Sequence, residues 1–180
     1  MLDDEQENTN MTAAALEFQE LKEAALDVKN QLMKCMQNKC RLDQDIDASM
    51  KKQSARNEKI AKLLEAMKFI EAECAKVEQK AHMPNTTSQQ HEAILKRVQM
   101  VDNVKRELYS LNVDVAREDR CLQALKAVGD ELNKQIKEMY EVVQQLDALL
   151  AEAEKNGISE DNNKSIAKII SQVSESLSED

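Results

Sequence analysis

The chain has 180 residues, of which 42% are hydrophobic, 33% charged and only 2% aromatic, with two glycines and no tryptophan. This composition argues against a compact domain with an aromatic core and is typical of long helices and coiled coils. The net charge of −9 does not favour nucleic acid as a partner, because nucleic-acid footprints are basic. The expected class is all-α: a long antiparallel coiled-coil helical hairpin with a short C-terminal amphipathic helix, part of a multi-helix assembly.

The first predicted element is a long helix over residues 11–82. Residues 1–10 before it are acidic and polar, and we expect them to be disordered. From Phe18 onward, apolar residues keep one heptad frame along this arm, and spacing of this kind sustained over many turns predicts a coiled coil. Three polar residues interrupt the apolar positions in the middle of the arm: Ser49, Gln53 and Arg56.

A turn is predicted at residues 83–90. Pro84, the only proline, lacks an N–H and disfavours helical geometry in the residue before it. Thr87 or Ser88 is expected to cap a second coiled-coil helix over residues 91–156. Because the two arms are nearly equal in length, the simplest arrangement is an antiparallel hairpin.

The end of the chain predicts a third, short helix. Gly157 is expected to close the second arm, since glycine readily adopts the left-handed conformation found after helices. The short helix has one apolar face and is too short to be stable alone. It docks either on residues 139–153 of the second arm or on another subunit, and the sequence leaves both open. The predicted division is linker 157–163, helix 164–177 and acidic tail 178–180.

Apolar residues beside the heptad seam widen the apolar stripe of both arms. A stripe wider than the two seam positions indicates that further helices pack against it. These residues, together with the apolar face of the short helix, are the predicted partner-binding positions: Met36, Met50, Leu64, Cys121, Val128, Val142, Leu149, Ile166, Ile169, Ile170, Val173 and Leu177.

The pairing of the two arms is predicted from their polar residues. If the turn is centred between residues 85 and 86, Phe18 faces Ala153, so a large side chain meets a small one. Gln53 then faces Glu118, and Arg56 lies one layer away. We expect an Arg56–Glu118 ion pair with Gln53 hydrogen-bonded beside it, and we expect these three residues to set the register of the hairpin.

The sequence predicts no catalytic, cofactor or metal site. It has no glycine-rich phosphate loop, HExxH motif or nucleophile elbow. His82 and His91 are interpreted as solvated residues at the edges of the turn. The cysteines form no CxxC pair, and their reduced state would fit the cytosol or nucleus. No segment is apolar enough to span a bilayer, and acids rather than a basic and apolar run follow Met1, so no signal peptide is expected.

Two charged clusters have alternative interpretations. The basic residues of the first arm are interpreted as a charged exterior that pairs with acids of the second arm, and direct contact with microtubules is left open. The serines near the C-terminus are either an ordinary polar end or targets of an acid-directed kinase. The clusters are Lys51, Lys52, Arg56, Lys59 and Lys62, and Ser174, Ser176 and Ser178.

The function expected from these features is that of a non-catalytic coiled-coil scaffold subunit of a hetero-oligomeric complex. Acidic, all-helical subunits of this size are common in spindle, kinetochore and centrosomal assemblies, which would make the protein cytoskeletal and cytoplasmic, and nuclear during division. The alternative is an adaptor or tether subunit in vesicle trafficking. No small-molecule substrate is expected; the partners would be other coiled-coil subunits.

Overall fold

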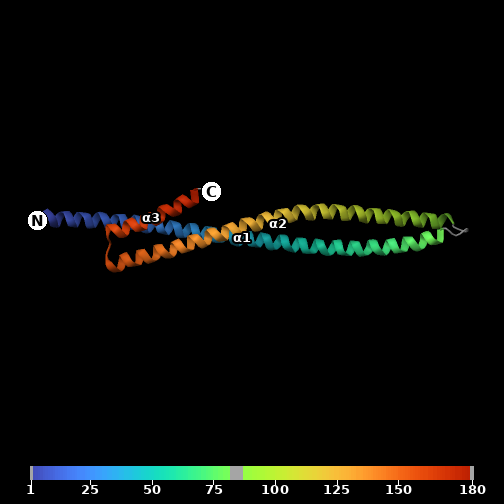
Figure 1. Cartoon of the computed structure of the whole chain (residues 1–180), viewed down its shortest axis with the longest axis horizontal. Helices are drawn as coiled ribbons and strands as arrows, with labels where there is room; N and C mark the ends of the chain where they lie inside the picture. The colour runs from blue at the N-terminus through green and yellow to red at the C-terminus, as the bar shows by residue number, and fades with distance from the viewer. Residues whose placement is uncertain (1, 82–86, 179–180) are drawn as a thin grey trace. The chain divides into compact units, whose positions relative to one another are not determined.

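The computed structural model describes residues 2–81 and 87–178, with side chains at 13–76, 78–79 and 87–177. In this part of the chain every regular element is a helix: α1 (Leu2–Ala81), α2 (Ser88–Asn156) and α3 (Glu160–Ser178) (Figure 1). The two long helices pack together. The predicted all-α class is confirmed.

The starts of α2 and α3 follow standard capping chemistry. The backbone N–H of Thr87 donates to Oε1 of Gln90 (3.0 Å), the side-chain half of a capping box, and Thr87 O accepts from Gln90 N (3.0 Å). At α3, Oγ of Ser159 accepts from the N–H of Asn162 (3.2 Å). Gly157, which ends α2, has φ +98°, the left-handed conformation predicted for it.

Two boundaries in the structure differ from those predicted from the sequence. The linker is 157–159 rather than 157–163, because Ser159 is an N-cap and two acids in the first turn favour the positive end of the helix dipole. Residues 2–10 continue α1 instead of being disordered, since extending an existing helix avoids the cost of nucleation. α2 begins at Ser88, inside the turn predicted at residues 83–90. His82 and the expected centre of the turn fall within residues 82–86, which lie outside the described residues.

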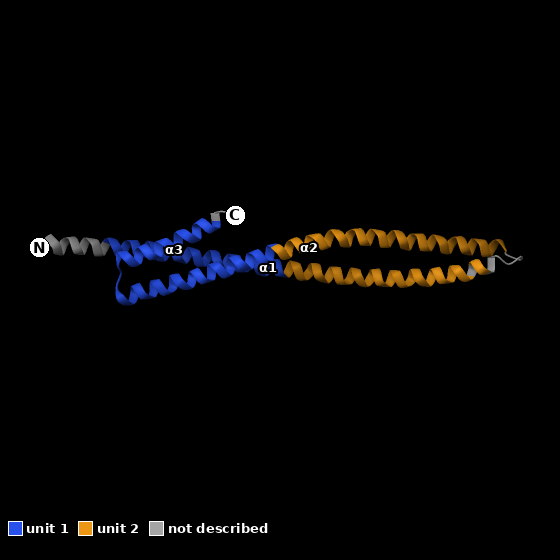
Figure 2. Cartoon of the chain, viewed as in Figure 1, with its two compact units in different colours: residues 1–43, 128–180 blue, residues 44–127 orange. Residues whose placement is uncertain are grey.

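The chain divides into two units (Figure 2). Unit 1 comprises residues 1–43 and 128–180, and unit 2 comprises residues 44–127. Each contains part of α1 and part of α2, and α3 belongs to unit 1.

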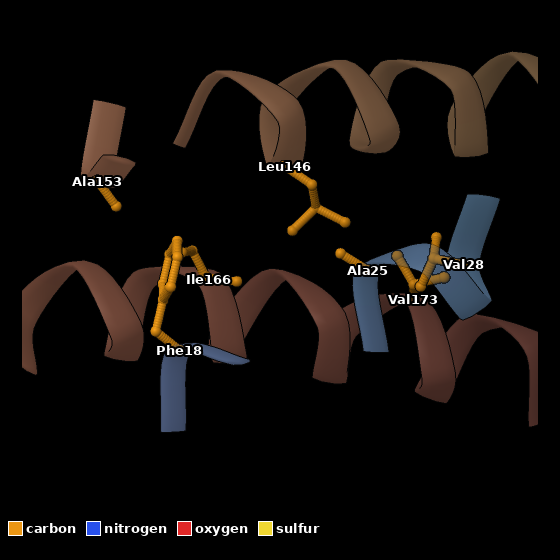
Figure 3. Packing of buried hydrophobic residues seen from close by; sticks show 7 residues of the cluster. All are labelled: Phe18, Ala25, Val28, Leu146, Ala153, Ile166 and Val173. Atoms are coloured by element: carbon orange, nitrogen blue, oxygen red, sulfur yellow. The ribbon is translucent and has the colours of Figure 1, made fainter. Parts of the chain in front are cut away.

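Unit 1 has a three-helix core. Phe18 of α1 lies beside Ala153 of α2 and Ile166 of α3, and Leu146 points toward Ala25 (Figure 3). Ala25, Leu146, Ala153 and Ile166 are each no more than 1% exposed. Large side chains therefore meet alanines across the α1–α2 seam, as close packing requires.

Ion pairs across the seam give the direction of the helices in unit 1. Lys22 Nζ lies 2.5 Å from Oε1 of Glu154. Lys29, seven residues later on α1, contacts Asp147, seven residues earlier on α2. Within this unit α1 and α2 therefore run antiparallel and keep a heptad step. These pairs are exposed and add little to stability individually.

Unit 2 has a sparser core. Among its described residues, the buried ones are Val101, Leu108 and Leu122, all on α2. Across its seam Lys59 Nζ lies 2.9 Å from Oε1 of Glu107. Fewer buried side chains leave this unit less apolar stabilisation than unit 1.

Candidate interaction surfaces

A polar layer crosses the seam of unit 2. Nη2 of Arg56 donates to Oε1 of Glu118 at 2.7 Å, and Nη1 forms an ion-pair contact with Oε2. The expected Arg56–Glu118 pair is present. Gln53 does not join it as expected: its Nε2 donates to Asp119, the next residue along α2. Glu118 is engaged by Arg56, so the amide of Gln53 bonds the neighbouring carboxylate.

The pair is partly shielded from water, and its environment favours the charged state of the arginine. The side chain of Arg56 is 22% exposed and that of Glu118 is 42% exposed. The hydrogen bond from Arg56 to Glu118 raises the pKa of the guanidinium above its ordinary value. A hollow lies beside the layer, lined in part by Ser49, Lys52 and Cys121. The guanidinium of Arg56 therefore stays charged throughout the physiological range.

We expect Glu118→Arg to lower the thermal midpoint of the chain, because it places two guanidinium groups together beside Lys52. Combining it with Arg56→Glu restores an ion pair in the opposite sense and should recover much of the loss. Circular dichroism melts of the wild type, both single variants and the double variant measure this coupling. Arg117→Glu is the matched control, since Arg117 is 70% exposed and contacts Asp114 on its own helix. A double variant no more stable than the sum of the single changes would show that the pair does not set register.

α3 occupies one side of the seam of unit 1. Ile166 and Val173 enter the core cluster, and Ile169 and Ile170 pack against it. Val142 and Leu149 of α2 pack against the same cluster. Six of the twelve predicted partner-binding residues are thus used within the chain: Val142, Leu149, Ile166, Ile169, Ile170 and Val173.

A buried asparagine ties α3 to α1. Asn163 is 0% exposed, and its Nδ2 donates to the carbonyl oxygen of Ala14 (3.0 Å) and to Oε2 of Glu17 (3.4 Å). A polar side chain in an apolar interface favours the one alignment in which it finds partners. Sequence reasoning placed Asn163 in the linker; the Ser159 cap is the signal that would have included it in the helix.

The other side of the seam in unit 1 carries exposed apolar residues. Met36 follows Lys29 by seven residues, so it continues the row of Lys22 and Lys29 along α1. Tyr140 precedes Asp147 by the same step and is therefore the residue that the pairing places opposite Met36. Met36 is 52% and Tyr140 53% exposed. Along this row, the two ion pairs of Lys22 and Lys29 are therefore followed by a pair of positions occupied by apolar side chains.

Two further residues of α1 extend this apolar row. Leu26 and Met33 lie four residues after Lys22 and Lys29, one turn further along the same side of the helix. They are 56% and 58% exposed. Leu26, Met33 and Tyr140 were not predicted from the sequence. Leu26 and Met33 lie further from the seam than the predicted residues of α1, and the residues predicted on α2 all lie on the other side of the seam from Tyr140. We call this set the open face: Leu26, Met33, Met36 and Tyr140.

The remaining predicted partner-binding residues are exposed but do not form one stripe. In unit 2, Met50 and Leu64 on α1 are 46% and 40% exposed. Cys121 on α2 is exposed and lines the hollow beside the polar layer. In unit 1, Val128 is 57% and Leu177 37% exposed. The single widened stripe expected from the sequence is therefore divided: in unit 1, α3 covers one side of the seam and the open face lies on the other.

The basic residues of α1 in unit 2 bind acids of both long helices. Arg56 and Lys59 contact α2, at Glu118 and Glu107. Lys62 pairs with Glu58 of its own helix, 2.8 Å away.

Other kinds of site were searched over the described residues. No group of three or more His, Cys, Asp and Glu side chains there could hold a metal ion. His91 is exposed at the start of α2. None of the described helices contains a segment apolar and long enough to cross a bilayer.

In unit 1, α3 therefore covers one side of the seam between α1 and α2. The open face, on the opposite side, remains exposed and could pack against a further helix. Comparison of the chain with protein-family models, with curated proteins and with solved structures finds no match.

Proposed function

We propose that the chain is a non-catalytic scaffold subunit of a hetero-oligomeric complex, an antiparallel coiled-coil hairpin that binds helices of other subunits. The observation that carries the proposal is the open face of unit 1. It groups four large apolar side chains, each more than half exposed, beside ion-paired residues. An amphipathic helix fits such a face, because it can bury its apolar side on Met33 and Met36 and place charges beside Lys29 and Asp147.

The proposed setting is a cytoskeletal or mitotic assembly of the spindle, kinetochore or centrosome. Support for it is architectural: long acidic helical subunits serve as spacers and joints in such assemblies. A fluorescent fusion that stays away from all three structures through the cell cycle would contradict this placement. A trafficking tether ranks second, because α3, which would dock on its membrane-bound partners, is packed against its own chain.

Met36→Glu tests the proposed docking. A carboxylate in the middle of the open face would have to be buried by a partner helix, so we expect the affinity for the partner subunit to fall by about tenfold or more. The chain itself should fold unchanged, since Met36 is 52% exposed. The measurement is co-purification of tagged chain with its coiled-coil partners, followed by titration with the isolated partner.

Met100→Glu is the matched control, a methionine of the same 52% exposure in unit 2, outside the open face. It should leave the affinity unchanged. Equal losses for the two variants, or no loss for Met36→Glu, would show that the open face is not the docking surface.

A further inference from the structure

The last turn of α3 lies over a hollow whose polar rim is acidic. Ser176 is exposed, and its Oγ donates to the carbonyl oxygen of Gln172 at 2.9 Å. It borders the hollow between α2 and α3 together with Glu131 and Glu138 of α2. The apolar part of the lining includes Val142 and Val173. No lysine or arginine is among the described residues that line it.

The sequence around Ser176 suits an acid-directed kinase. Glu175 precedes it, and Glu179 follows three residues later. Ser174, by contrast, has Leu177 at that distance. Ser176 lies two residues before the last residue of α3, Ser178. Terminal turns of helices open readily, so a kinase can reach this hydroxyl without unfolding the core of unit 1.

We propose that Ser176 is a phosphorylation site and that its modification releases the C-terminal half of α3 from α2. A protein kinase transfers the γ-phosphoryl group of ATP to Oγ: the new O–P bond replaces the bond to the β-phosphate, ADP leaves, and the hydroxyl proton passes to the base of the kinase. The proposal does not depend on what binds the open face.

Electrostatic repulsion determines the expected effect of phosphorylation, which is to weaken the docking of the last turn of α3. A phosphoserine carries about −1.5 to −2 charges at neutral pH. At Ser176 this charge would border the same hollow as the carboxylates of Glu131 and Glu138. It would also lie at the negative end of the helix dipole of α3. Both effects oppose docking of this turn, whereas the core contacts of Ile166 are remote from it and would keep the first half of α3 in place.

The test phosphorylates the full chain with an acid-directed serine kinase and ATP, locates the phosphate by mass spectrometry, and measures hydrogen exchange over residues 169–177. We expect phosphate on Ser176 and no such label in Ser176→Ala. Exchange should become faster by on the order of tenfold, because the phosphate is repelled by the two carboxylates that line the same hollow. Exchange around Ile166 should change little.

Two variants separate the electrostatic mechanism from a general disturbance. In Glu131→Lys with Glu138→Lys the phosphate meets two ammonium groups, so phosphorylation should slow the exchange instead. Ser174→Glu is the matched control, because its hydroxyl bonds Ile170 on α3 and does not border the hollow; it should leave exchange nearly unchanged. An unlabelled Ser176, unchanged exchange after labelling, or the same acceleration in the double lysine variant would overturn the proposal.

Discussion

Replacing Leu146 with alanine is expected to lower the free energy of unfolding by about 2–5 kcal/mol, the usual cost of removing a large aliphatic side chain from a core. Leu146 is 0% exposed and belongs to the cluster in which all three helices of unit 1 meet. It points toward Ala25 (Figure 3), whose short side chain cannot fill the space that the leucine would leave. Urea denaturation followed by circular dichroism measures the change.

Leu26→Ala is the matched control for this prediction. It makes the same chemical change on α1, but Leu26 is 56% exposed on the open face. The free energy of unfolding of the isolated chain should change by less than about 0.5 kcal/mol. If the two variants were equally stable, the three-helix core would not be the main source of stability in unit 1.

Ending the chain after Asn156 is expected to have the second large effect. The truncation removes Ile166 and Val173 from the core, and burial of each is worth about 1.5–3 kcal/mol before the cost of ordering α3 is subtracted. It also exposes Val142 and Leu149. We expect a lower thermal midpoint, binding of an apolar dye, and self-association that increases with concentration.

A chain ending after Ser174 is the control for the truncation. It keeps Ile166 and Val173, with the buried asparagine and its bonds to α1. Its melting and dye binding should stay close to those of the full chain. A chain ending at Asn156 that melts like the full chain and binds no dye would mean that α3 serves a partner rather than its own core.

The pairing of the long helices was predictable because apolar spacing and polar interruptions constrain the same register. Phe18 and Ala153, which the predicted pairing places opposite each other, are both buried. Arg56 and Glu118 interrupt the seam on different helices, and the predicted pairing brings them into contact. A shift by one heptad would leave the carboxylate facing apolar groups, at a cost of several kcal/mol where water is excluded.

The ends of the helices were less predictable, because several local signals compete there. After Ser159 the polar sequence could have continued the linker to residue 163. Instead Ser159 caps α3, and Asn163 lies against α1. The acidic start of the chain has a disorder-like composition, yet α1 extends to Leu2. The composition of a segment indicates how much apolar surface it can bury. It does not indicate whether an adjoining helix already supplies the nucleus from which that segment can continue as a helix.

By itself, the sequence determined the helical class and the pairing of Arg56 with Glu118, because these depend on spacing along one helix and on matching two such patterns. It did not determine the partner of Gln53, which is Asp119. Only the tertiary structure decided where α3 packs and which apolar residues stay exposed. The spacing of Ile166 and Val173 specifies an apolar face but not the surface that will cover it. That choice depends on the linker of residues 157–159 and on the hydrogen bond from Asn163 to α1, which together place this face on its own chain.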